Sequence, residues 1–275
     1  MDNGSVTRWE ISRITADGVA TMEDLLATEE PLEIRLVYGT KLHPQKKNLA
    51  VTMRTPGNDT ELAMGFLYTE GIISNENDVA GCSILRENVV QVTLREEVNL
   101  DLNSMDRNFY TTSSCGVCGK ASIDAIRTES AIYDKAKPFA VKASVIYNLP
   151  QLLRDSQEAF KDTGGIHAAA LFGITGNLLM LREDVGRHNA LDKLIGAALQ
   201  QGVVPLQEHI LLLSGRASFE LVQKAVMAGI KVIVAVGAPS SLAVETADEY
   251  GVTLAGFVKQ DRMNIYCGAE RIVLD

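Results

Sequence analysis

Two cysteines three positions apart are the residues of this chain best placed to carry out covalent chemistry. Cys115 and Cys118 lie in the string SSCGVCGK, residues 113–120. Two thiols at this spacing can form a strained disulfide, supply half of a zinc site, or receive a sulfur atom and pass it on. The glycines beside them, Gly116 and Gly119, allow a tight and open backbone around both thiols.

The zinc and disulfide-exchange alternatives each lack a feature that they need. A structural zinc site takes four ligands, and the other two cysteines, Cys82 and Cys267, are isolated and far from this pair in sequence. A thioredoxin-like pair follows a strand directly and opens a helix, and the polar run before Thr111 does not supply that strand. We therefore expect no zinc, and we keep thiol–disulfide exchange as an alternative to sulfur transfer.

The residues around the cysteine pair suit sulfur transfer. A persulfide forms when a thiolate attacks a donor persulfide, and nearby cations and hydrogen-bond donors raise the thiolate fraction. Lys120 and the hydroxyl run at residues 111–114 offer such surroundings. These residue types do not by themselves rank Cys115 above Cys118.

Composition excludes several classes of protein. A formal charge of −9 over 275 residues argues against a general nucleic-acid or anionic-membrane surface, because the positive residues are scattered. The first eighteen residues contain no apolar segment of a signal peptide, and no later stretch is apolar for about 18 residues. Four cysteines do not make a secreted disulfide framework. We expect a cytoplasmic protein with two domains.

The first half of the chain predicts a smaller α+β domain over residues 1–138, which ends in the connector that bears the cysteine pair. Its patterns predict a helix from about residue 58 to 68 and strands at 32–38, 48–54, 82–85 and 89–94. The charged, proline-broken stretch at residues 133–139 places the boundary near 138.

The second half, residues 139–275, alternates between strand and helix patterns. Helices are predicted at 145–161, 188–200, 218–228 and 240–250, and strands at 166–172, 178–182, 209–213, 231–236, 252–258 and 263–266. The continuous apolar runs at 211–213 and 232–234 are typical of parallel strands that are buried on both faces. We expect an α/β domain with a mostly parallel sheet.

A sheet of this kind binds ligands outside the carboxyl ends of its strands, where helix N-termini offer N–H groups to anions. Three strand ends are informative: residues 214–218 with Ser214 and Arg216, residues 237–241 with small and hydroxyl side chains, and residues 257–262. Together they predict a pocket for phosphates and a base or pterin ring.

Ionisable residues also gather at 183–193, between a strand and a helix. Asp184, Arg187 and His188 cluster where the helix begins and could reach the same pocket, whereas Asp192 and Lys193 fit the solvated face of an amphipathic helix. His167 opens an apolar strand, where a hydrogen-bonded core histidine is the common outcome, and we include it among the pocket candidates.

Five strings give the chain a resemblance to a known family. CGVCG at 115–119, HAAALF at 167–172, EDVGRHNALDKLIG at 183–196, SGRASFELVQKA at 214–225 and GFVKQDR at 256–262 resemble the FdhD family of formate dehydrogenase accessory sulfurtransferases. The resemblance implies a sulfur carrier that accepts persulfide sulfur from a cysteine desulfurase. The sulfur would pass to the bis-molybdopterin guanine dinucleotide cofactor before that cofactor enters apo-formate dehydrogenase.

The resemblance also implies a homodimer, a cytidine-deaminase-like three-layer fold for the C-terminal domain, and roles for individual residues. Cys115 would carry the persulfide, and Cys118 would assist it or release the sulfur by forming a disulfide. The cofactor would bind along a segment in which Lys259 and Arg262 face phosphate, and a guanine nucleotide would mimic it. The residues of this segment are Phe257, Val258, Lys259, Gln260, Asp261 and Arg262; the pocket residues are His167, Arg187, His188, Ser214 and Arg216.

We expect no deaminase-type zinc site in the C-terminal domain, because the sequence lacks the zinc-binding motif of that fold. Zinc deaminases use H-x-E followed by P-C-x-x-C, whereas His167 is followed by Ala168 and Ala169 and the cysteine pair precedes the histidine.

An alternative function to sulfur transfer is that of a non-catalytic chaperone of formate dehydrogenase or its cofactor. In that case the two cysteines would only shape a loop.

Overall fold

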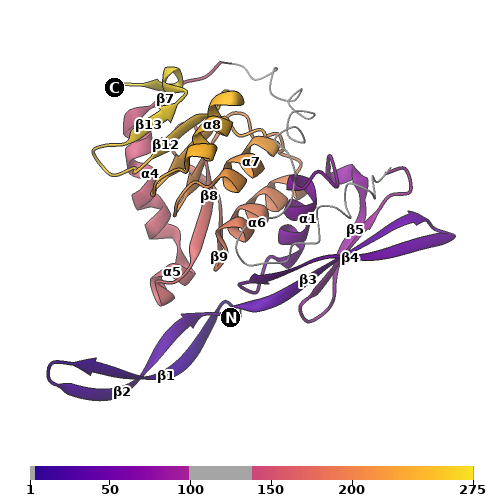
Figure 1. Ribbon diagram of the computed structural model, residues 1–275, viewed down its shortest axis with the longest axis horizontal. Coiled ribbons are helices and arrows are strands. Elements are labelled where there is room, and N and C mark those ends of the chain that lie inside the picture. Colours follow the sequence, from indigo (N-terminus) through magenta and orange to yellow (C-terminus); the bar gives the residue numbers. More distant parts are fainter. Residues whose placement is uncertain (1–3, 99–137, 275) are drawn as a thin grey trace.

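The computed structural model describes residues 4–98 and 138–274, which form a body of two packed units and a projecting hairpin (Figure 1). Cys115 and Cys118 lie outside the described residues. The hairpin pairs β1 (Val6–Thr15) with β2 (Gly18–Ala27).

The N-terminal unit is a four-stranded sheet covered on one face by a helix. Its elements are β3 (Glu30–Thr40), β4 (His43–Arg54), α1 (Asp59–Thr69), η1 (Glu76–Asp78), β5 (Val79–Arg86) and β6 (Val89–Leu94), with strand order β4-β3-β6-β5. Successive strand side chains point to opposite faces, and Leu32, Ile34 and Leu36 of β3 are buried in the core that contains α1. The helix and the four strands predicted between residues 32 and 94 each have a counterpart in this unit.

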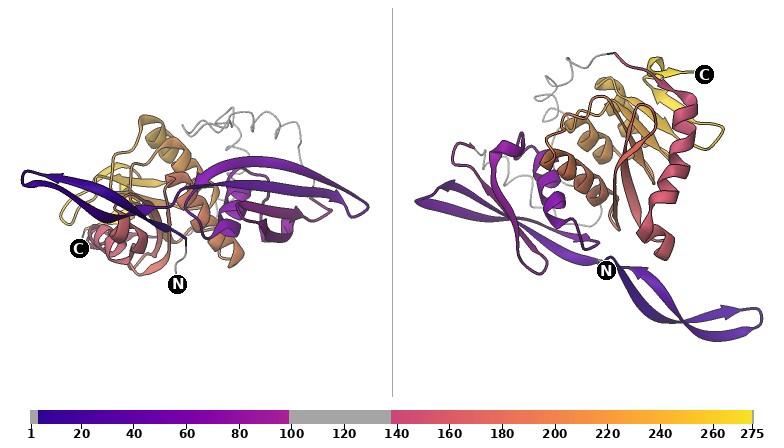
Figure 2. Two further views of the ribbon diagram at one scale, coloured as in Figure 1. Left: turned by 90° about the horizontal axis from the view of Figure 1, so that it is seen from below. Right: turned by 180° about the vertical axis from the view of Figure 1, so that it is seen from behind.

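The C-terminal unit is a six-stranded sheet with helices on both faces (Figure 2). Its helices are α4 (Ala143–Ser156), α5 (Glu158–Thr163), α6 (Arg187–Gln200), α7 (Phe219–Met227), α8 (Ser241–Glu249) and η3 (Ala269–Arg271). Its strands are β8 (His167–Gly173), β9 (Leu178–Asp184), β10 (His209–Leu213), β11 (Val232–Ala235), β12 (Thr253–Gly256) and β13 (Asn264–Cys267). Their order in the sheet is β13-β12-β11-β10-β8-β9. Two short strands, β7 (Val141–Lys142) and β14 (Ile272–Val273), pair with each other in a separate sheet.

Two apolar clusters fill the space on the two faces of this sheet. Leu211 and Leu213 of β10 belong to the cluster that contains α6, α7 and α8, and Ile210 and Leu212 belong to the cluster that contains α4. The continuous apolar run of β10 therefore marks a strand buried on both faces, as predicted. The described residues form a mixed α/β fold, and its cytidine-deaminase-like character stays a prediction.

The expectation of a mostly parallel sheet is wrong. Among the described strands, β10–β11 and β11–β12 pair in parallel, but β8–β9, β8–β10 and β12–β13 pair antiparallel. An apolar run is typical of parallel strands because it reports burial on both faces, but a central strand of a mixed sheet is buried in the same way, so the connections decide strand direction. The tight turn at residues 173–177 forces β9 to return beside β8.

The predicted helix at 145–161 is two helices, α4 and α5, with a break at Gln157. The Glu183 carboxylate, which comes from β9, accepts hydrogen bonds from the Ala159 and Phe160 N–H groups at 3.0 Å each. This carboxylate satisfies N–H groups that the first turn of α5 leaves open. A side chain from a distant strand therefore fixes the start of α5, and no local pattern could show it.

The two units share one core, in which α1 packs across α6. Gly65 of α1 and Gly196 of α6 make the close approach possible, because an added Cβ at Gly65 would lie 1.8 Å from the Asp192 carbonyl oxygen. A Cβ at Gly196 would lie equally close to the Glu61 carbonyl oxygen. The division of the chain into domains at residue 138 stays a prediction, and the described residues pack extensively across it.

Candidate functional site

The three predicted strand ends lie side by side beyond the carboxyl ends of β10, β11 and β12. The Gly237 N–H donates to the Gly215 carbonyl at 3.0 Å, and the Phe257 N–H donates to the Gly237 carbonyl at 3.1 Å. A parallel bridge between Ala217 and Pro239 adds a further link. These bonds continue the sheet beyond its strands and hold the loops as one edge, which we call the ligand edge.

His167 joins the ligand edge because β8 runs antiparallel to β10. The first residue of β8 therefore lies at the carboxyl end of β10. The Ala168 N–H donates to the Ser214 hydroxyl oxygen at 2.8 Å, and the Ser214 N–H donates to the Ala168 carbonyl at 3.0 Å. A Cβ on Gly215 would lie 3.4 Å from His167 Nδ1, so glycine leaves room for the imidazole.

Arg187 and His188 reach the same edge from the start of α6. His188 Nε2 lies 3.4 Å from the Ser218 hydroxyl and 3.8 Å from a carboxylate oxygen of Glu220. Ser218 is the N-cap residue of α7, and its hydroxyl makes no cap hydrogen bond, so it is available to the imidazole. Glu220 is a neighbour of this site that the sequence patterns did not identify.

Both histidines of the ligand edge are neutral near pH 7. Burial is the main cause that lowers the pKa of His188, to about 4, and the positive charges of Lys224 and Arg187 lower it further, whereas Glu220 opposes them. Burial and then Arg187 lower the pKa of His167 as well, against the opposing charge of Asp184. Each neutral imidazole can donate one hydrogen bond and accept one.

Arg187 has the clearest unmet requirement for a partner. Its Nε is buried and has no hydrogen-bond partner among the described residues. A guanidinium is always charged and presents its donors in a planar fork that matches carboxylate and phosphate groups. A buried donor without an acceptor costs free energy, so an anion that reaches this position would be stabilised.

The segment at residues 257–262 provides an aromatic ring and two cations beside the same edge. Phe257 is 46% exposed and has a φ of +53°, a conformation that a bulky residue adopts only when its surroundings impose it. Lys259 and Arg262 are exposed and close a turn in which the Lys259 N–H donates to the Arg262 carbonyl at 2.9 Å. The remaining residues of the turn, Gln260 and Asp261, are also exposed.

Val258 and Arg216 differ in their availability to a ligand. Val258 is 2% exposed and packs in the cluster that contains α4, so its side chain is not available to a ligand. Arg216 is exposed, so its side chain is available to a ligand. A Cβ added at Gly237 would lie 3.1 Å from the Cγ of Arg216, so glycine leaves room for this side chain.

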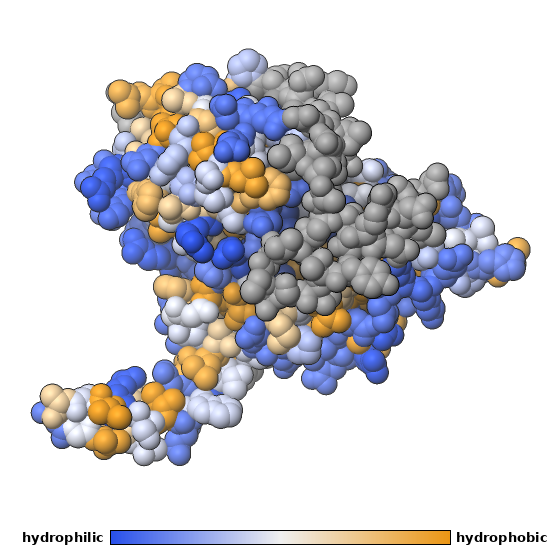
Figure 3. All heavy atoms as spheres, viewed as in Figure 1, coloured by the Kyte–Doolittle hydropathy of each residue, from blue (hydrophilic) through white to orange (hydrophobic). Residues whose placement is uncertain are grey.

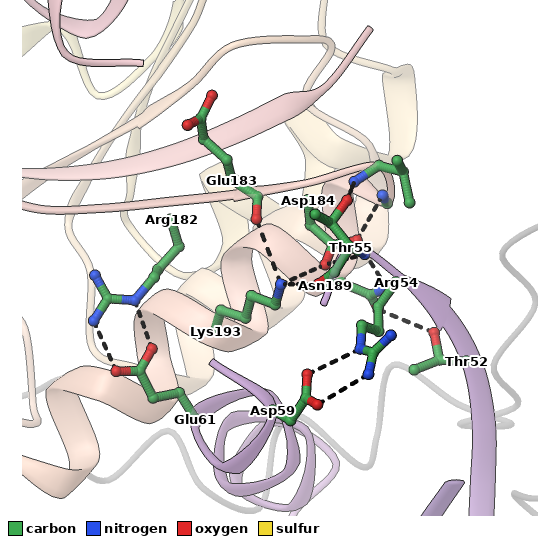
Figure 4. Close-up of polar contacts among 12 residues, drawn as sticks. Thr52, Arg54, Thr55, Asp59, Glu61, Arg182, Glu183, Asp184, Asn189 and Lys193 are labelled. Carbon is green, nitrogen blue, oxygen red and sulfur yellow. Dashed lines mark hydrogen bonds and ion pairs between the residues drawn. The ribbon is translucent and has the colours of Figure 1, made fainter. Parts of the chain in front are cut away.

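The expectation that Asp192 and Lys193 are solvated is wrong. Lys193 Nζ lies 2.7 Å from a carboxylate oxygen of Asp184, and the two side chains are 2% and 0% exposed (Figure 4). Asp192 forms a second buried ion pair with Lys224 at 2.9 Å. The helix pattern could not show this, because α1 and α7 supply the partners of Asp192, and β9 and the loop after β4 supply those of Lys193.

The Lys193 pair belongs to a polar network between the two units. Lys193 also donates to the Thr55 carbonyl at 2.7 Å, and Asp184 accepts from the Thr55 N–H at 3.2 Å and from Asn189. Nearby, Arg54 donates two hydrogen bonds to the Asp59 carboxylate (Figure 4). Asp184 therefore holds the loop after β4 against α6, and its role is structural.

The two described cysteines are poor nucleophiles. Burial raises the pKa of the Cys82 thiol to about 11, and burial also raises the pKa of Cys267. Their thiols contact the carbonyl oxygens of Thr60 and Val252. Since a thiolate is the reactive form, neither residue is a candidate for sulfur transfer, and the prediction rests on the pair at 115 and 118.

Residues 4–98 and 138–274 contain no group of three or more His, Cys, Asp or Glu side chains that could hold a metal ion. The expectation that the cysteine pair holds no zinc stays a prediction, since it concerns residues outside these ranges. No helix in the described part of the chain is long and apolar enough to cross a membrane.

Comparison with known proteins gives one consistent result. Residues 27–273 match the family described as FdhD/NarQ. A protein named sulfur carrier protein FdhD from Mycolicibacterium paratuberculosis is 51% identical, over 97% of this chain and 98% of the relative. Proteins of the same name from Streptomyces coelicolor and Sulfurisphaera tokodaii are 50% and 43% identical; the matches cover 98% of this chain in both cases, and 97% and 99% of the relatives.

A solved structure agrees in fold. The crystal structure of a Desulfotalea psychrophila protein described as a formate dehydrogenase accessory protein superposes with a TM-score of 0.74. The superposition covers 98% of this chain and 99% of that chain at 21% sequence identity. At this identity the likeness concerns the fold.

Proposed function

The chain belongs to the FdhD/NarQ family, and from this premise we propose that it is a sulfur carrier for formate dehydrogenase. The carrier accepts persulfide sulfur from a cysteine desulfurase and transfers it to the bis-molybdopterin guanine dinucleotide cofactor. It acts as a sulfurtransferase in the cytoplasm and as a homodimer. Its relatives' name, sulfur carrier protein, supports the first step of this proposal.

The observation that carries the proposal is that the other two cysteines, Cys82 and Cys267, are poor nucleophiles. Cys82 and Cys267 are partly buried with raised pKa values, so their thiols are protonated at neutral pH. In the proposed reaction the Cys115 thiolate attacks the outer sulfur of the donor persulfide. The donor S–S bond breaks, a new S–S bond forms on Cys115, and the desulfurase leaves as a thiolate.

Two routes would then release the sulfur from Cys115. In one, the acceptor attacks the outer sulfur with its own electron pair, the S–S bond breaks, Cys115 leaves as a thiolate, and the acceptor is oxidised by two electrons as it takes the sulfur. In the other, the Cys118 thiolate attacks the sulfur atom of Cys115, a disulfide forms between the two cysteines, and hydrosulfide leaves. A thiol reductant would restore the pair after the second route.

The ligand edge supports the cofactor part of the proposal. Arg187, Lys259 and Arg262 supply cations for the phosphates of a dinucleotide, and the exposed Phe257 ring supplies a surface on which a guanine base can stack. The cofactor is the substrate of this reaction. The protein residues named here would bind and orient it, and the neutral histidines would offer hydrogen bonds to it.

Mass spectrometry of the intact chain tests the sulfur step. After incubation with a cysteine desulfurase and cysteine, the wild-type chain should gain the mass of one sulfur atom, and a reductant should remove it. Cys115→Ala should abolish this gain, whereas Cys82→Ala, the matched control, should keep it. Undiminished persulfide on Cys115→Ala would rule out Cys115 as the carrier.

The same variants separate the alternatives. A thiol–disulfide oxidoreductase would form a disulfide at Cys115 and Cys118 without gaining sulfur. A non-catalytic chaperone would still support formate dehydrogenase activity after both cysteines are replaced by alanine, measured in a strain that lacks its own copy of the protein.

A further inference from the structure

The carboxylate of Glu220 lies at the ligand edge, among groups that suit anions. Glu220 is in the first turn of α7, two residues after Ser218, which is the N-cap residue of that helix. One of its carboxylate oxygens lies 3.8 Å from His188 Nε2, which in turn lies 3.4 Å from the Ser218 hydroxyl. The start of α7 and the start of α6 therefore bring this carboxylate to the ligand edge.

The Glu220 carboxylate keeps its capacity to accept hydrogen bonds. Within residues 4–98 and 138–274 it accepts no hydrogen bond, and its separation from His188 is too long for one. The pKa of His188 is lowered to about 4, so this ring is uncharged near pH 7 and does not neutralise the carboxylate. The Glu220 side chain is 31% exposed, so a ligand can reach it.

The cations around Glu220 make a carboxylate at this edge informative. Arg187 has a buried Nε without a partner among the described residues, and the exposed residues Arg216, Lys259 and Arg262 are cations of the same edge. A carboxylate beside such cations repels phosphate. A ligand that offered only phosphates would therefore bind less tightly because of Glu220. A ligand that also turns hydrogen-bond donors toward this carboxylate would gain from it.

Individual polar groups, and no broad apolar patch, mark the body of the molecule in the view of Figure 3. There, hydrophilic residues separate small groups of hydrophobic ones over the coloured part of both units. A polar site selects a ring by the hydrogen bonds that the edge of the ring makes, because a ring without them leaves polar groups of the site unpaired.

The donors that suit a carboxylate are present on guanine and on pterin. Both contain an aminopyrimidinone ring, in which a ring N–H and an amino group lie side by side. The two oxygens of a carboxylate can accept from both groups at once, and such charge-assisted hydrogen bonds are stronger than neutral ones. Hypoxanthine keeps the ring N–H but lacks the amino group.

We propose that Glu220 selects the aminopyrimidinone ring of the ligand by accepting hydrogen bonds from its ring N–H and its amino group. This role rests on the proposed function, in which the molybdenum cofactor is the substrate, and it names the side chain that recognises a base of that cofactor. Guanine and pterin share the ring chemistry, so each needs its own pair of probes.

A ratio of affinities separates this role from a structural one. An acidic residue in the first turn of a helix also interacts favourably with the helix dipole, and that contribution changes stability alone. Selection of the ring changes the ratio of the affinities for guanosine diphosphate and inosine diphosphate, which differ only by the amino group. Both nucleotides carry the same phosphates, so the ratio is insensitive to the charge that a substitution removes.

Isothermal titration calorimetry of the full chain measures this ratio. The wild-type chain should bind guanosine diphosphate about tenfold to a hundredfold more tightly than inosine diphosphate, the range for one hydrogen bond to a charged group. Glu220→Ala should bring the ratio close to one, and Glu220→Gln, which keeps one acceptor oxygen, should lower it less. Glu158→Ala, at an exposed position in the first turn of α5, is the matched control and should keep the wild-type ratio.

Pterin and lumazine form the second pair of probes, because lumazine has an oxygen in place of the amino group. The change of their fluorescence on binding measures their affinities. A preference for pterin that depends on Glu220, with a nucleotide ratio that does not, assigns the position to the pterin of the cofactor. The reverse result assigns it to guanine.

Either of two results would overturn the role of Glu220. One is a wild-type chain without a preference within either pair, and the other is a preference that Glu220→Ala and Glu220→Gln both leave unchanged while circular dichroism shows them folded. Intact-mass measurement of persulfide on the same samples keeps the sulfur step separate. A chain that gains sulfur without these preferences rejects the role of Glu220 alone, whereas a chain that gains no sulfur rejects the proposed function.

Discussion

Arg187 and His188 are neighbours in sequence but have different electrostatic states at the ligand edge. The buried Nε of Arg187 has no partner among residues 4–98 and 138–274, whereas burial and two nearby cations lower the pKa of His188. Their combination gives a positive site beside an uncharged hydrogen-bonding group. Such a site selects an anion and can still donate a hydrogen bond to it.

The stability of the protein should fall as the pH is lowered from about 6.5 to about 4. His188 has a pKa near 6.5 when unfolded and about 4 when folded. The unfolded state therefore binds the proton first, and the free energy of unfolding decreases by at most about 1.4 kcal/mol per pH unit for this group. Urea unfolding at a series of pH values measures this dependence.

His188→Gln should make the acid dependence shallower. Its effect is partial because the lowered pKa values of His167 and His209 act in the same direction. His43→Gln, at the exposed start of β4, is the matched control and should keep the wild-type dependence. An unchanged slope in His188→Gln would contradict a buried neutral imidazole at this position.

Arg187→Ala should weaken binding of guanosine diphosphate, which serves as a probe for the nucleotide part of the cofactor. The loss of charge-assisted hydrogen bonds corresponds to about a tenfold to a hundredfold lower affinity, and Arg262→Ala should act in the same direction. Isothermal titration calorimetry measures the affinity, with exposed Arg154→Ala of α4 as the control. Absence of any nucleotide binding to the wild-type chain would remove the phosphate assignment of the ligand edge.

At the scale of elements, the crossing of α1 and α6 depends on two glycines. Backbone atoms of each helix occupy the space where the other would place a Cβ. The ion pair between Asp192 and Lys224 is buried beside the crossing, and Thr69 donates a hydrogen bond to the Asp192 carboxylate at 2.9 Å. Small residues bring the helices together, and the polar groups between them are paired.

Gly65→Ala should destabilise the protein by about 1–3 kcal/mol or more, since an extra methyl group in a packed interface forces the helices apart. The midpoint of urea unfolding measures the change. Gly81→Ala is a suitable control, because a Cβ at this exposed strand position would meet nothing within 4 Å. Equal midpoints for Gly65→Ala and wild type would show that the two helices are not held this closely in solution.

The elements of the sheet were easier to predict than their directions. Every strand predicted after residue 138 has a counterpart in the structure. In the central strands β10 and β11, burial on both faces leaves a continuous apolar run. Strand direction and the break between α4 and α5 depend on contacts between distant residues. The hairpin of β1 and β2 was not predicted, since its strands mix exposed apolar and charged residues.

For the whole molecule, the central point is that one apolar core extends through both units. Leu62 and Leu67 of α1 belong to the same cluster as Leu194 of α6 and Val222 of α7. The ligand edge lies on the C-terminal unit, and the polar network around Lys193 ties the loop after β4 to that unit.

The two units should therefore unfold together in one transition. Calorimetric and van't Hoff enthalpies should agree, and far-ultraviolet circular dichroism should give the same midpoint. Tryptophan fluorescence is not a suitable probe for this comparison, because Trp9 lies in the projecting hairpin of β1 and β2. Two separated transitions would instead support independent domains on either side of residue 138.

The sequence by itself predicted the cysteine pair at 115 and 118 as the site of sulfur chemistry, and it indicated an α/β fold and the strand ends at which Ser214, Arg216 and residues 257–262 gather. These features follow from residue type and local periodicity, which need no distant contact. The tertiary structure alone decided that the pKa values of His167 and His188 are lowered, that Lys193 and Asp192 are buried in ion pairs, and that burial raises the pKa values of Cys82 and Cys267. Burial and charge at each of these side chains are set by elements far away in sequence, so no local pattern contains them.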